Sequence, residues 1–165
     1  MKHLILFIAI FIAGCSTQQT DQLTPLQKNQ IKSEVKAVAE SLMANLGKLD
    51  AEGWIKYYAD TPDWVMYGPD GASWDFQTFK KASLEIAGSA SAYKYATIQK
   101  NYIVISKDVV IWAVVAKDEY TMKSGDKMRF DSHPYTLVFK KIAGQWKVIY
   151  SHDSGVPVMQ KAGKK

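Results

Sequence analysis

Hydrophobic residues recur every three or four positions in the first part of the chain after residue 24. Thr24-Pro25-Leu26-Gln27 has the form of a capping box with proline at the first helical position. One apolar stripe follows at helical spacing, formed by Ile31, Val35, Val38, Leu42, Leu46 and Leu49. Asp50 and Asp75 are placed to cap two further helices. The pattern therefore predicts three helices, with a short strand at 64–67 and a turn at 68–71 before the third.

From about residue 95 the period changes to the alternation that is typical of β-strands. Four segments show this alternation, at 95–105, 109–122, 127–141 and 146–153. Only short turn signals separate them, and short links force neighbouring strands to run antiparallel. The sequence therefore predicts an α+β domain in which helices cover one face of a curved antiparallel sheet.

The first 15 residues have the pattern of a targeting segment. Lys2 precedes an unbroken apolar run from Leu4 to Ala13, which is too short to span a bilayer. The run ends in Ile12-Ala13-Gly14-Cys15, which resembles the lipobox of bacterial lipoprotein signal peptides. The resemblance implies that Cys15 is acylated, with groups such as palmitate, and anchors the protein to a membrane. The alternative is an ordinary cleaved signal peptide with a chance cysteine.

Composition indicates the remaining boundaries. Residues 16–24 are polar and lack periodicity, which predicts a flexible tether. Residues 25–157 predict one domain, because a chain of 165 residues is too short for two ordinary ones. Residues 158–165 predict a basic, disordered tail. In a bacterium with two membranes, a lipobox followed by Ser16 implies an outer-membrane lipoprotein that faces the periplasm; in any case we expect a lipid-anchored protein of the cell envelope.

The net charge of +5 changes this picture little. Lysines are spread along the chain, as on a solvated surface, and cluster only at Lys161, Lys164 and Lys165. This tail is placed to touch anionic lipid headgroups. No nucleic-acid recognition motif is present, so no nucleic-acid partner is expected. Cys15 is the only cysteine, so no disulfide can form within one molecule.

The last strand is apolar at its start and polar at its end, as expected for a strand that leaves the core and lines a cavity. One face of it carries Trp146, Val148, Tyr150, His152 and Ser154. A two-residue turn at Ala143-Gly144 places Tyr135 opposite His152 and His133 opposite Ser154. A single bulge would change the face on which these side chains lie.

The same reasoning for the turn at Ser124-Gly125 extends the inner face to the preceding strand. It places Trp112 opposite Leu137, Ala116 opposite His133 and Asp118 opposite Asp131. The predicted inner face therefore holds a polar cluster, whose members are His133, Tyr135, His152 and Ser154, with Asp118 and Asp131 nearby.

This cluster suits proton transfer, because histidine titrates near neutral pH and two facing carboxylates raise one pKa. The alternatives are structural. His152 would be buried and bonded to backbone, and His133 and the two aspartates would be solvated groups at strand ends. Tyr67 would line the mouth of the pocket or pack at its rim. No metal-ligand spacing and no glycine-rich phosphate loop are present, so neither a metal nor another cofactor is expected.

The order of elements resembles the nuclear transport factor 2-like superfamily, in its SnoaL-like branch. The segments that carry the resemblance are Tyr67-Gly68-Pro69-Asp70-Gly71, Thr136 to Lys141 and the ending Gly144 to Ser154, with its Gly-x-Trp, aliphatic residues, His and Ser. The resemblance implies a cone-shaped domain, with three N-terminal helices packed on the concave face of a strongly curved antiparallel sheet and a pocket at the open end. It also implies a homodimer through the outer sheet face.

Members of this superfamily include dehydratases, isomerases, hydrolases and binding domains, so the resemblance implies a pocket and leaves the reaction open. The first interpretation is an anchored domain that binds a small, partly apolar molecule without catalysis, with Tyr67, Trp112, Asp118, Asp131, Tyr150 and Ser154 around the ligand. The alternative is a cofactor-independent acid–base enzyme that uses His152 with Tyr135 or His133.

Overall fold

The computed structural model describes residues 22–163. Its elements, in chain order, are α1 (Pro25–Gly47), α2 (Ala51–Ile55), β1 (Val65–Tyr67), β2 (Ser73–Trp74), α3 (Phe76–Ser89), β3 (Ala90–Ser106), β4 (Val109–Met122), β5 (Lys127–Ile142), β6 (Gln145–Asp153) and β7 (Val158–Gln160). Cys15 and the rest of the lipobox lie outside the described residues, so the predicted anchor stays a prediction. No helix among residues 22–163 is both long and apolar enough to cross a bilayer.

The helices begin where the sequence places their caps. Thr24 and Gln27 form the reciprocal capping box, with side-chain to backbone distances of 3.2 and 2.8 Å. The Asp50 carboxylate accepts a hydrogen bond from the backbone of Gly53, and the Asp75 carboxylate accepts one from the backbone of Thr78. These bonds satisfy N–H groups that the first turn of a helix leaves free.

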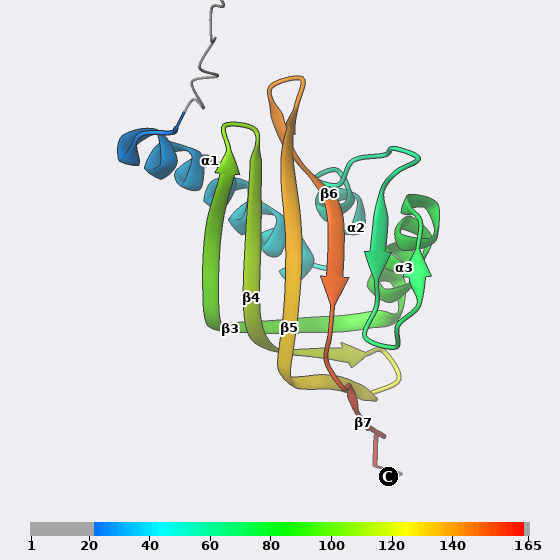
Figure 1. Cartoon of the computed structure of the whole chain (residues 1–165). Helices are drawn as coiled ribbons and strands as arrows, with labels where there is room; N and C mark the ends of the chain where they lie inside the picture. The colour runs from blue at the N-terminus through cyan, green and yellow to red at the C-terminus, as the bar shows by residue number, and fades with distance from the viewer. Residues whose placement is uncertain (1–21, 164–165) are drawn as a thin grey trace, which may run out of the picture.

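The strands form one curled sheet in the order β2-β1-β6-β5-β4-β3, and β7 pairs with β5 (Figure 1). The four long strands β3 to β6 are antiparallel neighbours, as predicted. The sheet is nevertheless mixed, because β1 runs parallel to β6. The short links predict an antiparallel sheet, but β1 and β6 are joined through α3 and four strands, and a long connection does not force antiparallel pairing.

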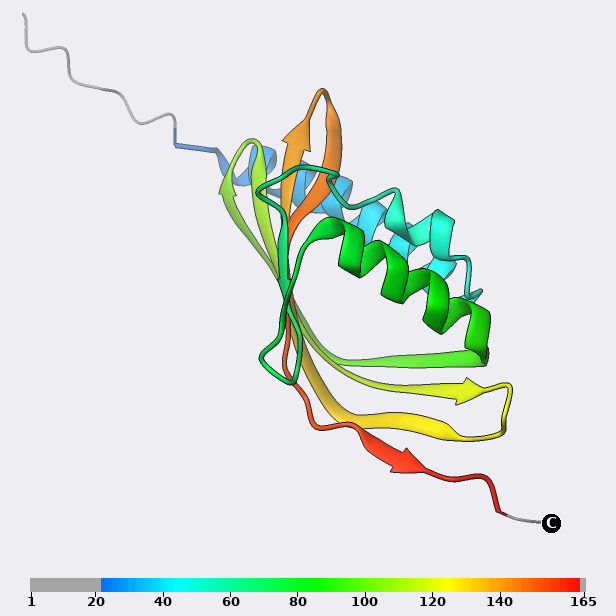
Figure 2. The same ribbon diagram turned by 90° about the vertical axis from the view of Figure 1, so that its right-hand side faces the viewer.

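The predicted α+β cone is confirmed. Figure 2 shows the far halves of β3, β4 and β5 curling beneath α3, so that the helices lie on the concave side. The register shifts by a β-bulge or irregularity between each pair of these long strands, and also between β5 and β6. Bulges bend a strand and increase its twist, which accounts for the strong curvature.

Apolar side chains from the helices and the concave sheet face form the core. Its largest fully buried side chains are Val35, Val110, Phe139 and Val148. Trp64 packs against Phe76 and Phe79 between the short β-strands and α3. This core fills one end of the cone, around the β5–β6 turn, and polar residues occupy the concave face farther along β5.

The end of the described chain forms a strand where disorder was expected. β7 pairs antiparallel with the start of β5, at Lys127, Met128 and Arg129. The Asp126 carboxylate accepts hydrogen bonds from Lys161 Nζ at 3.0 Å and from the backbone of Ala162 at 2.9 Å. Because β6 ends at Asp153 while β5 extends farther, β5 has an unpaired edge there, and β7 covers it.

Candidate functional site

The predicted register between β4 and β5 is correct as far as Ala116. Trp112 lies opposite Leu137, and Ala116 lies opposite His133. A bulge then shifts the pairing, so that Asp118 lies opposite Phe130 and not opposite Asp131. Asp118 is buried on the concave side, whereas Asp131 is exposed and pairs with Arg129. The two predicted partners are therefore separated, and the prediction of facing carboxylates at 118 and 131 is wrong.

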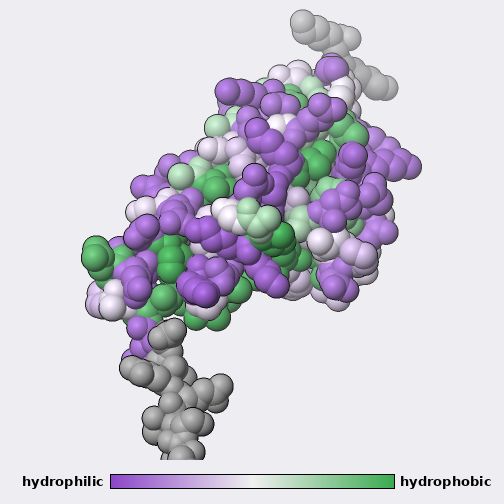
Figure 3. All heavy atoms as spheres, turned by 90° about the horizontal axis from the view of Figure 1, so that it is seen from above, coloured by the Kyte–Doolittle hydropathy of each residue, from purple (hydrophilic) through white to green (hydrophobic). Residues whose placement is uncertain are grey.

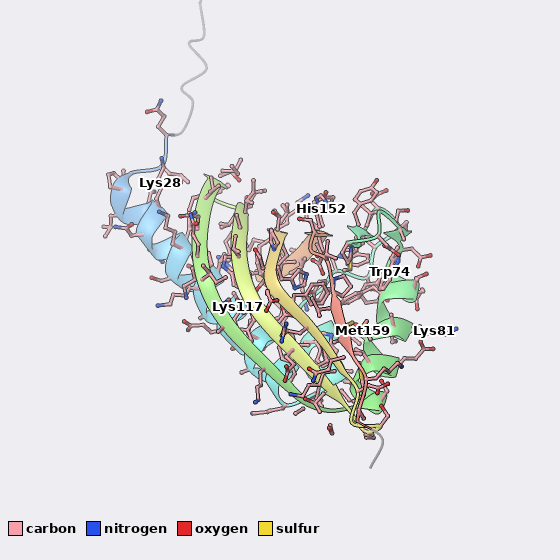
Figure 4. The ribbon with its side chains drawn as sticks, turned by 90° about the horizontal axis from the view of Figure 1, so that it is seen from below. Lys28, Trp74, Lys81, Lys117, His152 and Met159 are labelled. Carbon is pink, nitrogen blue, oxygen red and sulfur yellow. The ribbon has the colours of Figure 1, made fainter. Side chains whose placement is uncertain are left out.

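The predicted register between β5 and β6 fails at a second bulge. Phe139 lies opposite Val148 as expected, but Val138 lies opposite Tyr150, which leaves Ile149 as the extra residue. Because side chains alternate along a strand, one extra residue turns all the following ones to the other face. His152 therefore lies opposite Thr136 on the outer face and is exposed (Figure 4), and the prediction that it points into the cone is wrong.

Tyr150 and Ser154 lie on the outer face of the sheet together with His152. The Tyr67 ring, 41% exposed, lies 6.3 Å from the Tyr150 ring and 6.2 Å from the imidazole of His152. Ser154 is exposed, and its backbone N–H donates to the carbonyl of Pro134. A shallow depression of about 260 Å³ on the sheet has His152 and Ser154 in its lining. Of the predicted site residues, only His133, Tyr135, Trp112 and Asp118 remain together inside the cone.

His133 is held inside the cone by a buried carboxylate. Its Nδ1 lies 2.7 Å from Asp118 Oδ2, and the two side chains are 14% and 3% exposed. Because a carboxylate has only acceptor atoms, Nδ1 is the donor, and Nε2 is left to exchange a proton. The Phe130 ring is stacked on the imidazole, with centroids 4.3 Å apart. The ring of His133 is therefore fixed in both tautomer and orientation.

The bulge at Ile149, which turns His152 to the outer face, turns Asp153 to the inner face. Its carboxylate lies 3.9 Å from His133 Nε2, beyond hydrogen-bond reach but close enough for charge interaction. The Ser151 hydroxyl, also turned inward, donates to Asp153 at 3.4 Å. His133 thus lies between two carboxylates. Gly155 packs against this group. A Cβ added at Gly155 would lie 3.2 Å from the imidazole of His133, so only glycine fits at this position without displacing its neighbours.

Tyrosines from the three strands β3, β4 and β5 surround this polar group. The hydroxyls of Tyr95 and Tyr135 share a hydrogen bond of 2.7 Å, and the Trp112 ring meets Tyr135 edge-on. The rings of Tyr93 and Tyr120 lie 4.5 Å apart on the neighbouring strands β3 and β4. Aromatic faces with polar tips provide both apolar contact and hydrogen bonds to a bound molecule.

The family assignment follows from comparison with known proteins. The family model of the calcium/calmodulin dependent protein kinase II association domain matches residues 31–157, which is most of the chain. The chain belongs to this association-domain family. No curated protein matches the chain in sequence.

Solved structures confirm the fold of this association domain. A scytalone dehydratase-like protein from Novosphingobium aromaticivorans has a TM-score of 0.72 at 10% identity, covering 86% of this chain and 94% of its own. A ketosteroid isomerase-like protein from Erwinia carotovora atroseptica has a TM-score of 0.62 at 18% identity, covering 75% and 95%. An association domain-like protein from Xanthomonas campestris has a TM-score of 0.62 at 22% identity, covering 74% and 86%. The chain therefore has the fold that its resemblance to the nuclear transport factor 2-like superfamily implies, and proteins of that superfamily share it.

The electrostatics of the association domain's inner site favour proton exchange. Burial alone would lower the pKa of His133, but the hydrogen bond and charge of Asp118, with the charge of Asp153, outweigh it and raise that pKa. Burial raises the pKa of Asp153 to about 6, although the charge of His133 opposes the rise. Burial also raises the pKa of Tyr135 and Tyr93, so both hydroxyls stay protonated. The site therefore joins an imidazole and a carboxyl group, each with a raised pKa, to tyrosine hydroxyls that stay protonated.

Three buried polar atoms of the site have no hydrogen-bond partner among the described residues. They are Asp118 Oδ1, His133 Nε2 and the indole Nε1 of Trp112. Burying such atoms unpaired costs free energy, so they indicate where a ligand or water binds. No group of three or more His, Cys, Asp or Glu side chains within residues 22–163 is placed to hold a metal ion.

Sequence reasoning missed Asp153, Phe130 and the tyrosines of β3. The alternation of Tyr93 and Tyr95 was a usable signal, because residues two apart share a face of a strand. Asp153 and Phe130 could not be found in this way. Each takes its inward position from a bulge, and the bulges have no signature in the alternating pattern.

Proposed function

We propose that this association domain binds a small, partly apolar molecule inside the cone, with His133 as its polar anchor. The observation that carries the proposal is the pair of buried, unpartnered atoms, His133 Nε2 and Asp118 Oδ1, beside aromatic rings. With the imidazole protonated, a ligand acceptor would bind Nε2–H and a ligand donor would bind Asp118 Oδ1. The apolar part of the ligand would lie against Phe130 and Tyr135, which pack on the imidazole.

A second function, acid–base catalysis at the same site, is favoured by the position of His133 between two carboxylates. Asp118 fixes the Nδ1 proton, so that neutral Nε2 can accept a proton from a bound substrate. Asp153, with its pKa near 6, can then share the positive charge that forms on the imidazole. Similar folds carry the names dehydratase and isomerase, and both names describe reactions that move protons. In this version His133 replaces His152 as the proton carrier, because His152 lies on the outer face.

The experiment compares the two histidines. A library of small cyclic, uncharged compounds is screened by NMR against the wild-type protein, His133→Ala and His152→Ala. We expect bound compounds to shift the signals of Phe130 and Tyr135, and His133→Ala to weaken binding about tenfold or more, since a hydrogen bond to a charged group contributes about 1.5–3 kcal/mol. His152→Ala is the matched control and should bind as the wild type does.

Compounds that shift the NMR signals of residues outside the cone would contradict binding at His133. Equal losses of affinity in His133→Ala and His152→Ala would contradict it as well. Proton transfer is tested with the compounds that bind. We expect solvent deuterium to enter an activated C–H bond of the ligand in the presence of wild-type protein, and not with His133→Ala. Exchange that is unchanged by His133→Ala would contradict the catalytic version and leave the binding version standing.

We also propose that the domain is anchored in the cell envelope through acylated Cys15 and forms a homodimer through the outer sheet face. The lipobox supports the anchor. A row of neighbouring side chains on the outer face supports the dimer, and its members are Ile103, Ile111, Val138 and Tyr150. Ile103 is 48% exposed although it is apolar, as is typical of a residue that a partner covers. The family's description as an association domain is consistent with self-assembly.

A further inference from the structure

A second concave site lies away from His133, between the helices α1 and α2 and the β5–β6 hairpin. It is a cleft of about 630 Å³, large enough for a small organic molecule. The side chains that matter for its chemistry are Glu34, Lys56, Tyr57, Lys141, Trp146 and Lys147. None of them belongs to the site inside the cone.

Glu34 holds one wall of the cleft in place. Its Oε2 accepts hydrogen bonds from Lys141 Nζ at 2.8 Å and from Trp146 Nε1 at 2.9 Å. These bonds, with that of Lys141 the larger influence, lower the pKa of Glu34, so the carboxylate is ionised at neutral pH. Lys141 Nζ also lies 5.4 Å from the centre of the Trp146 ring. The carboxylate therefore fixes Lys141 and Trp146 against each other.

The cleft nevertheless has an excess of positive charge. Three lysines and one glutamate line it, which gives a local charge of 3 − 1 = +2. An ammonium group has three N–H donors; Lys141 uses one on Glu34, and Lys147 uses one on the carbonyl of Lys56, at 2.6 Å. The remaining donors are free to bind an anion. Lys56 Nζ lies 5.3 Å from the centre of the Tyr57 ring, which places an aromatic surface beside the charge.

We propose that this cleft binds a small phosphate-bearing molecule. The ammonium groups of Lys56, Lys141 and Lys147 bind the phosphate oxygens, and the organic part packs on Tyr57. Phosphate suits the cleft because it offers several oxygens to lysine point charges, and charge-assisted hydrogen bonds are about twice as strong as neutral ones.

Two sources would present this chemistry, a soluble organic phosphate and a phospholipid headgroup. Figure 1 shows the tip of the β5–β6 hairpin and the start of α1 at the same end of the molecule. Figure 3 looks down on that end, where hydrophilic side chains surround small hydrophobic patches. A membrane-bound protein held through its N-terminus would bring this end close to headgroups.

The first experiment titrates the full chain with inorganic phosphate at constant ionic strength, with chloride as the reference anion. The Trp146 indole N–H signal is followed by NMR. We expect a saturable shift, and Lys56→Met and Lys147→Met should each weaken binding about fivefold, since an exposed ion pair contributes up to about 1 kcal/mol. Lys81→Met, on an exposed part of α3 far from the cleft, is the matched control and should change binding less than twofold.

The second experiment separates the two sources. Glycerol phosphate is titrated in solution, and vesicles of phosphatidylglycerol or phosphatidylcholine are tested for binding that inorganic phosphate displaces. Displaceable binding to the anionic vesicles alone supports a headgroup, and binding of glycerol phosphate alone supports a soluble ligand. The absence of saturable binding in every arm, or binding that both Lys56→Met and Lys147→Met leave unchanged, overturns the proposal.

Discussion

His133 Nδ1 lies 2.7 Å from Asp118 Oδ2, although a regular β4–β5 ladder would set Asp118 opposite Asp131. The bulge after Ala116 sets Asp118 opposite Phe130 instead, and the carboxylate meets the imidazole of His133 diagonally across the two strands. The pair also depends on burial, since a carboxylate that is 3% exposed interacts with its partner with little screening by water. Together with Asp153, which the bulge at Ile149 turns inward, this pair forms the charged centre of the cone.

The pH dependence of stability is the first prediction. The pKa of Asp153 is about 6 in the folded protein against an ordinary 3.8, so folding favours its protonated form. The stability that this group contributes is fully present below pH 3.8 and is lost as the pH rises through 6. We expect urea denaturation to show a loss of roughly 2 kcal/mol over this window in the wild type, and a smaller loss in Asp153→Asn.

His133 changes stability in a higher window, which separates the two groups. Its pKa is raised above the ordinary 6.5, so its contribution is present below pH 6.5 and is lost as the pH rises through the folded value. In Asp153→Asn this second loss should remain, because Asp118 still bonds to the ring. His152→Gln, at an exposed position, serves as the control. An unchanged slope between pH 4 and 6 in Asp153→Asn would contradict burial of this carboxyl group.

The membrane anchor is tested by a single substitution. Cys15→Ala removes the only thiol in the chain, so the protein can no longer be acylated through sulfur. We expect the wild type to sediment with membranes and to take up a labelled palmitate, and Cys15→Ala to incorporate no label. Ser16→Ala is the matched control, because it keeps the cysteine. Labelling that persists in Cys15→Ala would refute the lipobox interpretation.

Dimerisation through the outer sheet face is tested at Ile103. A lysine there would place a charge in the middle of the apolar row with Ile111 and Val138, and a buried, unpaired charge opposes association. We expect size-exclusion chromatography with light scattering to give a dimer for the wild type and a monomer for Ile103→Lys. Lys81→Glu, which changes charge on α3, should leave the dimer intact. A wild-type monomer at high protein concentration would rule out this interface.

The sequence by itself determined the order of the helices, the four long strands and their antiparallel pairing. Caps such as Asp50 and Asp75 and turns such as Ala143-Gly144 act over a few residues, so their signals are complete in the local sequence. The sequence also determined that His133 and Tyr135 lie on the same face as Trp112, because the ladder is regular from that tryptophan to Ala116.

Only the tertiary structure decided which polar side chains meet inside the cone. The extra residue at Ile149 turns His152 outward and Asp153 inward, and the bulge after Ala116 exchanges Asp131 for Phe130 opposite Asp118. Bulges form where a long strand must bend around the helices, and that requirement comes from packing the whole sheet. The parallel pairing of β1 with β6 is likewise a contact between distant segments. Alternation fixes which residues share a face only while the ladder stays regular, and here the curvature of the cone interrupts it beside the site.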